Sequence, residues 1–288
     1  MVFRFFTHRL MIVVAAIWQL HGCGSVQSMV SEDLARSLSA GIANQTDLEL
    51  VKDGLPPYLL MLDGFITEDP ENADLYMAGA KLYGAYASFI GADKLRGERL
   101  TDKAFDYSKQ ALCFTEQQWC GIEKQPFDVY QQFVRAVDKQ DVGVLHTFAV
   151  SWVNYIDVHK SDWNAIADLP KVKATMLRII ELDEQYDGGS AHLYMAVLET
   201  LLPPALGGKP GVAKAHFEKV IELSSGQNLM AKVLYAERYA RTVYNQELHD
   251  RLLKEVLAQD PVIKDLALSN VIAQQRARDL LKTADEYF

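Results

Sequence analysis

The sequence has few cysteines and no excess of basic residues. Three cysteines among 288 residues are too few for a disulfide-framed mini-protein or a zinc site made of cysteines alone. The 29 Lys and Arg residues are outnumbered by 38 Asp and Glu residues, which gives a formal net charge of −9. An acidic chain without a basic block is poorly suited to binding a phosphate backbone. We therefore expect no nucleic-acid partner.

Short motifs for catalysis and metal binding are absent as well. No two of the five histidines after residue 23 stand four residues apart, and neither His-Glu-x-x-His nor Gly-x-Ser-x-Gly occurs. Gly207, Gly208 and Lys209 are followed by Pro210, which favours a tight turn over a phosphate-binding loop. We predict a protein that is not an enzyme and has no metal or cofactor. An active site spread over several helices is the alternative.

The apolar stretch near the start of the chain is too short to cross a bilayer. Leu10 to Leu20 would span about 17 Å as a helix, against a hydrocarbon core of about 30 Å. Arg4 and Arg9 precede it, as in a secretory signal. The sequence Leu20-His-Gly-Cys-Gly-Ser resembles a bacterial lipobox, which implies that Cys23 becomes a lipid-modified N-terminus. An ordinary export signal with a chance cysteine is the alternative.

These features predict three segments. Residues 1–22 would be a lipoprotein signal peptide, residues 23–31 the lipidated cysteine with a polar tether, and residues 32–288 a single all-helical domain. Acyl chains hold a protein at a membrane surface without spanning it. We therefore expect an exported protein anchored on the periplasmic side of a bacterial envelope membrane. The sequence does not decide between the inner and the outer membrane.

Export makes a disulfide between Cys113 and Cys120 possible. On one continuous helix their Cα atoms would lie about 10.5 Å apart, beyond the limit of about 7 Å for a disulfide. A bridge therefore requires the helix to end between them, and Thr115, Gly121 and the polar residues between them favour such an ending. Two buried thiols are the alternative.

Helical periodicity dominates the rest of the chain. Apolar residues recur at the spacing of amphipathic helices, and no segment shows the sustained alternation of a strand. Three such stripes are Leu75, Ala78, Leu82, Ala85 and Phe89; Val144, Phe148, Trp152 and Tyr155; and Leu229, Val233, Ala236, Ala240 and Val243. Prolines fall between the runs, and Pro56-Pro57 predicts a helix boundary because an interior Pro costs about 3 kcal/mol. We predict an all-α fold.

The helices show a loose repeat. Two helix boundaries align at an offset of 41 residues, which matches Leu182 with Leu223 and Tyr194 with Tyr235. Together with the Ala213-x-x-x-Phe217 spacing, this resembles the tetratricopeptide pattern in a degenerate and expanded form. A helix pair cannot bury its own apolar face, so pairs stack on their neighbours. We expect stacked helix pairs in a tetratricopeptide-like superhelix with a concave wall.

Aromatic residues are the most informative candidates for a binding site. Tyrosine combines a large apolar ring with a hydroxyl, which suits the wall of a cleft, and arginine suits a ligand carboxylate. The candidates for a ligand or partner cleft are Tyr76, Tyr83, Tyr86, Trp152, Tyr194, Tyr235, Arg238 and Tyr239. Any one of these rings could instead fill the core between helices.

Several segments resemble a known family. They are Gly54-Leu-Pro-Pro-Tyr-Leu-Leu-Met-Leu-Asp-Gly, Asn72-Ala-Asp-Leu-Tyr, Gly207-Gly-Lys-Pro, His216-Phe-Glu-Lys-Val-Ile-Glu-Leu-Ser and Asn228-Leu-Met-Ala-Lys-Val-Leu-Tyr-Ala. The chain resembles the T component of tripartite ATP-independent periplasmic (TRAP) transporters, the TatT-like lipoproteins. The resemblance implies a helical homotrimer that docks a periplasmic solute-binding protein and has a cleft or pore for an apolar or organic-acid ligand. A tetratricopeptide-like envelope scaffold without a small ligand is the alternative.

Overall fold

The computed structural model describes residues 37–90 and 94–288. The chain forms two compact units, Met1–Ile42 and Ala43–Phe288. In the first unit, the described residues 37–42 are helical. The predicted signal peptide, Cys23 and the tether to residue 31 lie outside the described residues, and the single domain from residue 32 stays a prediction.

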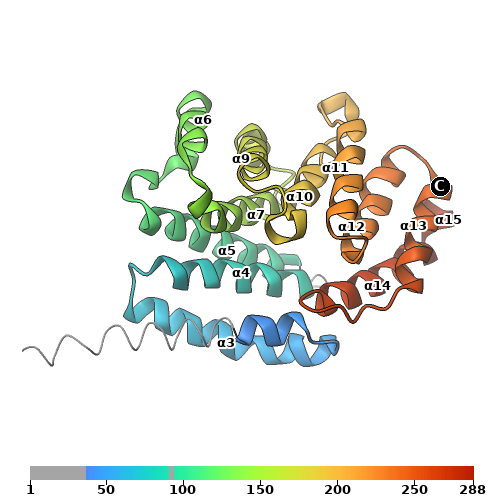
Figure 1. Ribbon diagram of the computed structural model, residues 1–288, viewed down its shortest axis with the longest axis horizontal. Coiled ribbons are helices and arrows are strands. Elements are labelled where there is room, and N and C mark those ends of the chain that lie inside the picture. Colours follow the sequence, from blue (N-terminus) through green and yellow to red (C-terminus); the bar gives the residue numbers. More distant parts are fainter. Residues whose placement is uncertain (1–36, 91–93) are drawn as a thin grey trace, which may run out of the picture. The chain divides into compact units, whose positions relative to one another are not determined.

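The second unit consists of helices joined by short turns (Figure 1). Its α-helices are α3 (Leu48–Glu68), α4 (Ala73–Phe89), α5 (Lys94–Thr115), α6 (Phe127–Ala136), α7 (Val142–Val158), α8 (Trp163–Ala167), α9 (Leu169–Leu182), α10 (Ser190–Glu199), α11 (Pro210–Leu223), α12 (Leu229–Leu234), α13 (Gln246–Ala258), α14 (Ala267–Lys282) and α15 (Ala284–Tyr287). Residues 37–90 and 94–288 contain no strand, so the all-α prediction is confirmed. The tetratricopeptide-like superhelix stays a prediction.

Short helices of other types connect or interrupt these elements. The 3₁₀ helices are η1 (Gln117–Trp119), η2 (Ile122–Lys124), η3 (Lys139–Asp141), η4 (Tyr186–Gly189) and η5 (Pro204–Leu206). The segment η6 (Tyr235–Ala240) is a π-helix that directly follows α12. None of the helices in the described ranges is both long and apolar enough to cross a membrane.

Polar side chains begin several of these helices. Asp47 accepts a hydrogen bond from the Leu50 amide at the start of α3, and Asn72 accepts from two amides at the start of α4. Asn228 and Asn245 cap α12 and α13 in the same way. These caps satisfy amides that have no partner inside the helix, so the local sequence determines where each helix starts.

The boundary predicted at Pro56-Pro57 is wrong, because α3 runs through both prolines. The two rings remove the hydrogen bonds that the carbonyls of Lys52 and Asp53 would otherwise accept. Lys52 is half-buried and Asp53 is exposed, so water can reach this side of the helix. The opposite face of α3 buries Leu55, Leu59 and other apolar residues, and this packing outweighs the local cost.

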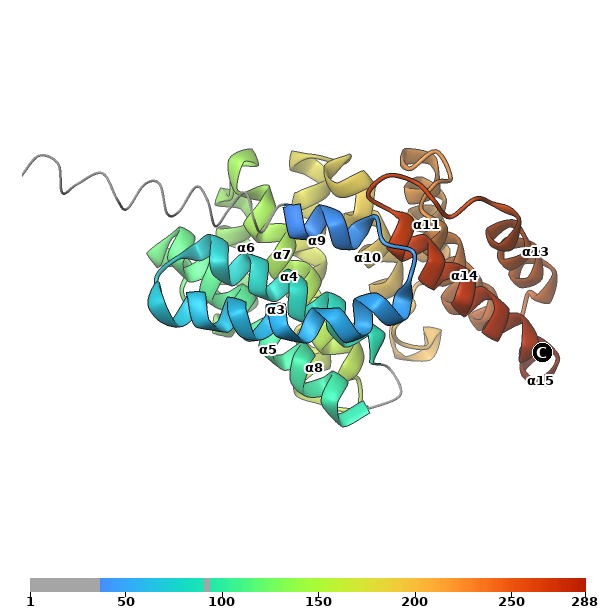
Figure 2. The same cartoon turned by 90° about the horizontal axis from the view of Figure 1, so that it is seen from below.

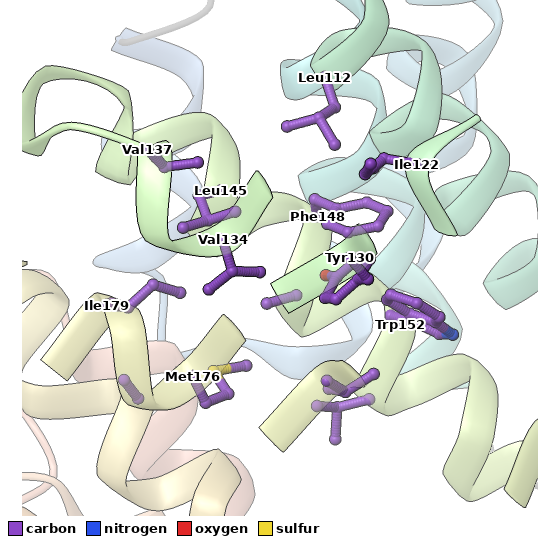
Figure 3. Close-up of a cluster of buried hydrophobic side chains, with 14 of the residues drawn as sticks. Leu112, Ile122, Tyr130, Val134, Val137, Leu145, Phe148, Trp152, Met176 and Ile179 are labelled. Atoms are coloured by element: carbon purple, nitrogen blue, oxygen red, sulfur yellow. The ribbon is translucent and has the colours of Figure 1, made fainter. Parts of the chain in front are cut away.

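The larger of two core clusters is centred on α7. Phe148 and Trp152 of α7 lie 5.1 Å apart between ring centroids, and Tyr130 of α6 meets Trp152 edge-on at 5.8 Å. Figure 3 shows these three rings together, with Leu145, Val134 and Met176 nearby. Tyr130 is fully buried, and its hydroxyl is paired with Thr175 of α9 at 2.5 Å. The cluster joins α5, α6, α7, α9 and α10.

The second core cluster lies among α11, α12, α13 and α14, and α10 contributes to both clusters. Met195 and Leu198 of α10 pack into the first cluster, whereas Leu193 and Ala196 pack into the second. A helix that is apolar on two sides has to be covered on both. The helix α10 therefore lies between the two cores and packs against both.

The start of the second unit lies beside its last long helix. Asn44 donates to the carboxylate of Asp265 at 3.1 Å and accepts from the backbone amide of Asp265 at 2.8 Å. Figure 2 shows the turn before α3 next to the start of α14. Residues 221 positions apart thus join the first and last parts of the unit.

Cys113 and Cys120 are joined by a disulfide, with their Cα atoms 4.3 Å apart. The helix α5 ends at Thr115, and η1 then turns the chain back. This turn brings the two residues closer than a continuous helix would allow. The disulfide closes the short loop between Cys113 and Cys120 at the C-terminal end of α5.

Candidate functional site

A pocket of about 590 Å³ lies along α7. The helices α4, α7, α10, α12 and α14 line it, together with residues of η4 and η6. Volumes of this order are typical of pockets that hold small organic ligands. The α7 residues that face the pocket are His146, Thr147, Val150, Ser151, Val153, Asn154 and Asp157.

The helix α7 has two contrasting faces. Phe148, Trp152 and Ile156 are fully buried in the first core cluster. Thr147, Ser151 and Asn154, at i, i+4 and i+7, line the pocket instead. A stripe of polar residues on an otherwise apolar central helix indicates a wet cavity. The hydroxyl of Thr147 donates to the Gly143 carbonyl, whereas the side chains of Ser151 and Asn154 form no hydrogen bond with any other described residue.

One end of the pocket is built around His146. Its Nε2 is 2.7 Å from the Ser190 hydroxyl, and its ring contacts Tyr186 at 5.1 Å and Tyr194 at 6.3 Å between centroids. Burial lowers the pKa of His146 to about 4. The carboxylate of Asp187 opposes this shift, and the ammonium of Lys81 adds to it. His146 is therefore a neutral hydrogen-bonding group at pH 7.

The turn η4 carries Asp187 to this end. Asp187, Gly188 and Gly189 all have positive φ, at 50°, 64° and 77°. Asp tolerates this left-handed conformation better than most residues. A Cβ on Gly189 would lie 2.5 Å from Leu223 Cδ1, so the turn also packs closely against α11. Burial, followed by the charge of Asp187, raises the pKa values of Tyr186 and Tyr194.

The other end of the pocket holds arginine and carboxylate pairs. Arg238 of η6 donates to Asp157 of α7 at 2.8 Å, and Arg276 of α14 forms an ion pair with Glu237. Asp157 Oδ1 is buried and accepts no hydrogen bond among the described residues. Arg238 stands within the π-helix η6, a geometry that is frequent at functional sites.

The structure brings two of the predicted cleft residues, Tyr194 and Arg238, to this pocket. Trp152 lies fully buried in the first core cluster. The ring of Tyr235 stacks on that of Phe217, with the centroids 5.2 Å apart, and it also contacts the ring of Tyr239. Tyr235 and Tyr239 both pack in the second cluster.

The remaining three predicted residues lie on α4 and do not line this pocket. The hydroxyl of Tyr83 donates to Asp63, and the hydroxyl of Tyr86 accepts from Arg96. Tyr76 contacts the rings of Tyr107 and Phe114. These tyrosines join α4 to α3 and α5.

Most polar pocket residues were not among the sequence candidates. They are Lys81, Ser88, His146, Thr147, Ser151, Asn154, Asp157, Tyr186, Asp187 and Arg276. The polar stripe Thr147, Ser151 and Asn154 inside an apolar helix was the sequence signal that could have revealed α7. No sequence pattern brings Lys81 or Arg276 to a pocket along α7, because α4 and α14 come together around it only in the folded chain.

The pocket lining combines groups of three chemical kinds. It offers neutral hydrogen-bonding groups, charges of both signs and an apolar wall that includes Val197, Met230 and Leu234. Within the described ranges, no group of three or more His, Cys, Asp or Glu side chains is placed to hold a metal ion.

Two comparisons relate this chain to known proteins. A protein of Treponema pallidum (strain Nichols), named "Uncharacterized protein", is 23% identical over 265 residues, which cover 85% of this chain and 81% of that protein. The model of the family described as "TRAP transporter T-component" (TAtT) matches residues 44–288, almost all of the second compact unit. The chain therefore belongs to the TRAP transporter T-component family.

Proposed function

We propose that this chain is a lipid-anchored periplasmic accessory protein of a TRAP-type solute transport system. It docks the periplasmic solute-binding protein of that system and shelters an organic acid in the pocket along α7. The protein binds and passes on a solute and does not transform it. Membership of the T-component family supports the transport role, and the pocket supports the binding role.

The composition of the pocket is the observation that carries the binding role. Lys81, Arg238 and Arg276 offer cations to a carboxylate inside a protein whose net charge is −9. Val197, Met230 and Leu234 offer an apolar surface to the rest of the ligand. Pockets for small ligands combine such an apolar wall with a few polar groups that fix orientation.

Other observations support the proposed location of the protein in the envelope and its proposed assembly into a homotrimer. The apolar stretch Leu10 to Leu20 and the lipobox-like residues before Cys23 support export and lipid anchoring. The homotrimer rests on the family resemblance. In such an arrangement the anchor keeps the pocket at the membrane surface, where the transporter receives its solute.

Native mass spectrometry of the purified full chain, incubated with the solute-binding protein of its transport system, tests this function. We expect a complex of the two proteins that carries additional small-molecule mass. Lys81→Ala should reduce the retained small molecule at least fivefold and leave the protein complex intact, because Lys81 is exposed and forms no ion pair among the described residues.

A matched control is Lys254→Ala, which changes an exposed lysine of α13 that does not line the pocket. It should retain both the complex and the small molecule. A chain that forms no complex with the solute-binding protein would refute the transport role and favour a scaffold.

A further inference from the structure

The pocket is elongated, because it follows α7 for most of its length. His146 and Asp157 mark its two ends and are eleven residues apart in one helix. At 1.5 Å per residue, their Cα atoms lie about 16 Å apart. Thr147, Ser151 and Asn154 lie between these ends on the same face.

Each end of the pocket offers charges of both signs. At the first end, Lys81 and Asp187 both act on the His146 imidazole, and neither has an ion-pair partner in the described part of the chain. At the second end, Arg238 pairs with Asp157, and Arg276 pairs with Glu237. Asp157 Oδ1 still lacks a hydrogen-bond donor among the residues that the structure describes. The two ends therefore suit a ligand with a charged group at each terminus.

The middle of the pocket suits a chain of amide groups. Ser151 is buried, Asn154 is half-buried, and both face the pocket. An asparagine side chain donates and accepts, as a peptide group does, and a serine hydroxyl also does both. A plain hydrocarbon placed here would leave these groups without hydrogen-bond partners, which disfavours its binding.

Residues of α10 and α12 add an apolar wall to the pocket. It consists of Leu193 and Val197 of α10 and Met230 and Leu234 of α12. Apolar side chains of a ligand could pack there, and methionine adapts to side chains of different shape. A ligand with an amide backbone on one side and apolar side chains on the other matches both walls.

We propose that the solute held in this pocket is a short extended peptide of about four residues with both termini free. An extended chain spans about 3.3–3.6 Å per residue, so four residues fill most of the distance between the two charged ends. One terminus meets Lys81 and Asp187, and the other meets Arg238, Asp157 and Arg276. This inference rests on the proposed function, since it names the class of solute in the same pocket.

Titration calorimetry of the full chain with the tetrapeptide Ala-Val-Ala-Leu tests the proposal. The same peptide with an acetylated N-terminus and an amidated C-terminus is the first comparison, and decanoate, which has one charged end, is the second. We expect the free peptide to bind at least tenfold more tightly than either. Equal affinity of the free and the blocked peptide, or tighter binding of decanoate, would overturn the proposal.

Two lysine variants connect the binding to this pocket. Lys81→Ala should weaken binding of the free peptide at least fivefold and change binding of the blocked peptide less than twofold. Lys254→Ala should change neither. An equal loss for both peptides would show that Lys81 does not recognise a charged terminus, and the two-ended proposal would fail.

The outcomes also separate this proposal from the proposed function. If decanoate binds and the tetrapeptide does not, the pocket is a solute site but peptides are not its ligands. If no probe binds while the solute-binding protein still docks, the peptide proposal fails and the transport role remains. If neither the probes nor the solute-binding protein bind, both fail.

Discussion

Gly208 illustrates a position where one residue decides local geometry. A Cβ built on Gly208 would lie only 1.9 Å from the carbonyl oxygen of Leu202. The chain turns tightly here, and the amide of Lys209 donates to the Glu199 carbonyl at 2.8 Å. Pro210 then begins α11, as expected from its fixed φ and missing amide hydrogen. At the predicted tight turn the backbone therefore leaves no room for a side chain.

We expect Gly208→Ala to lower the free energy of unfolding by about 2–4 kcal/mol, because a backbone carbonyl cannot move aside as a flexible side chain could. Gly211→Ala is the matched control within α11, since a Cβ there would have no described atom within 4 Å beyond its chain neighbours and the backbone of its own helix. It should raise the free energy by about 0.5 kcal/mol, owing to the better helix propensity of Ala. Urea denaturation measures both, and equal effects would contradict the steric explanation.

At the scale of elements, one carboxylate joins three helices. Asp63 of α3 accepts hydrogen bonds from Tyr83 of α4 at 2.7 Å and from Tyr107 and Lys103 of α5 at 2.7 and 2.6 Å. Burial acts to raise the pKa of Asp63, but the hydrogen bonds from Lys103, Tyr107 and Tyr83 outweigh it and lower the pKa. Because α4 also forms one wall of the pocket, this cluster holds that wall in place.

Asp63→Ala should lower the free energy of unfolding by about 2–3 kcal/mol, because two half-buried hydroxyls and an ammonium lose their acceptor. The control Asp106→Ala removes a carboxylate of α5 that pairs with Lys109 on the surface, and its side chain is 68% exposed. Exposed pairs contribute about 0–1 kcal/mol. Thermal unfolding of the two variants should therefore differ clearly, and similar melting temperatures would argue against a three-helix role for Asp63.

At the scale of the whole molecule, buried histidines make the fold sensitive to acid. Burial lowers the pKa values of His146, His192 and His216. His192 and His216 also approach each other at 2.8 Å between their Nδ1 atoms, one from α10 and one from α11. The folded protein keeps these rings neutral at pH values where the unfolded chain would protonate them, so stability is lost as pH falls.

For His146, the loss should begin near its ordinary pKa of 6.5 and continue to about pH 4, where the folded protein also binds the proton. The contribution is on the order of 3 kcal/mol across that window. Urea denaturation at pH 7.5 and at pH 4.5 measures it. His146→Gln should reduce the loss between the two pH values, and an unchanged loss would show that His146 does not contribute.

The sequence by itself determined the class of fold and the family. Helical periodicity and Asn or Asp caps are local properties, so they are readable without any tertiary contact. The segments that carry the family resemblance lie within residues 44–288, which the family model matches. Pro56-Pro57 was misread because packing along α3 overrides the local cost of an interior proline.

Only the tertiary structure decided where the pocket lies. Aromatic residues at helical spacing look the same in a core as in a cleft, which is why Trp152 and Tyr235 stood beside Tyr194 as candidates. Arg238 meets Asp157 across 81 positions of sequence, and Lys81 acts on His146 from another helix. Such pairs depend on how α4, α7 and η6 pack, and helix packing is set by many weak contacts distributed over the whole chain.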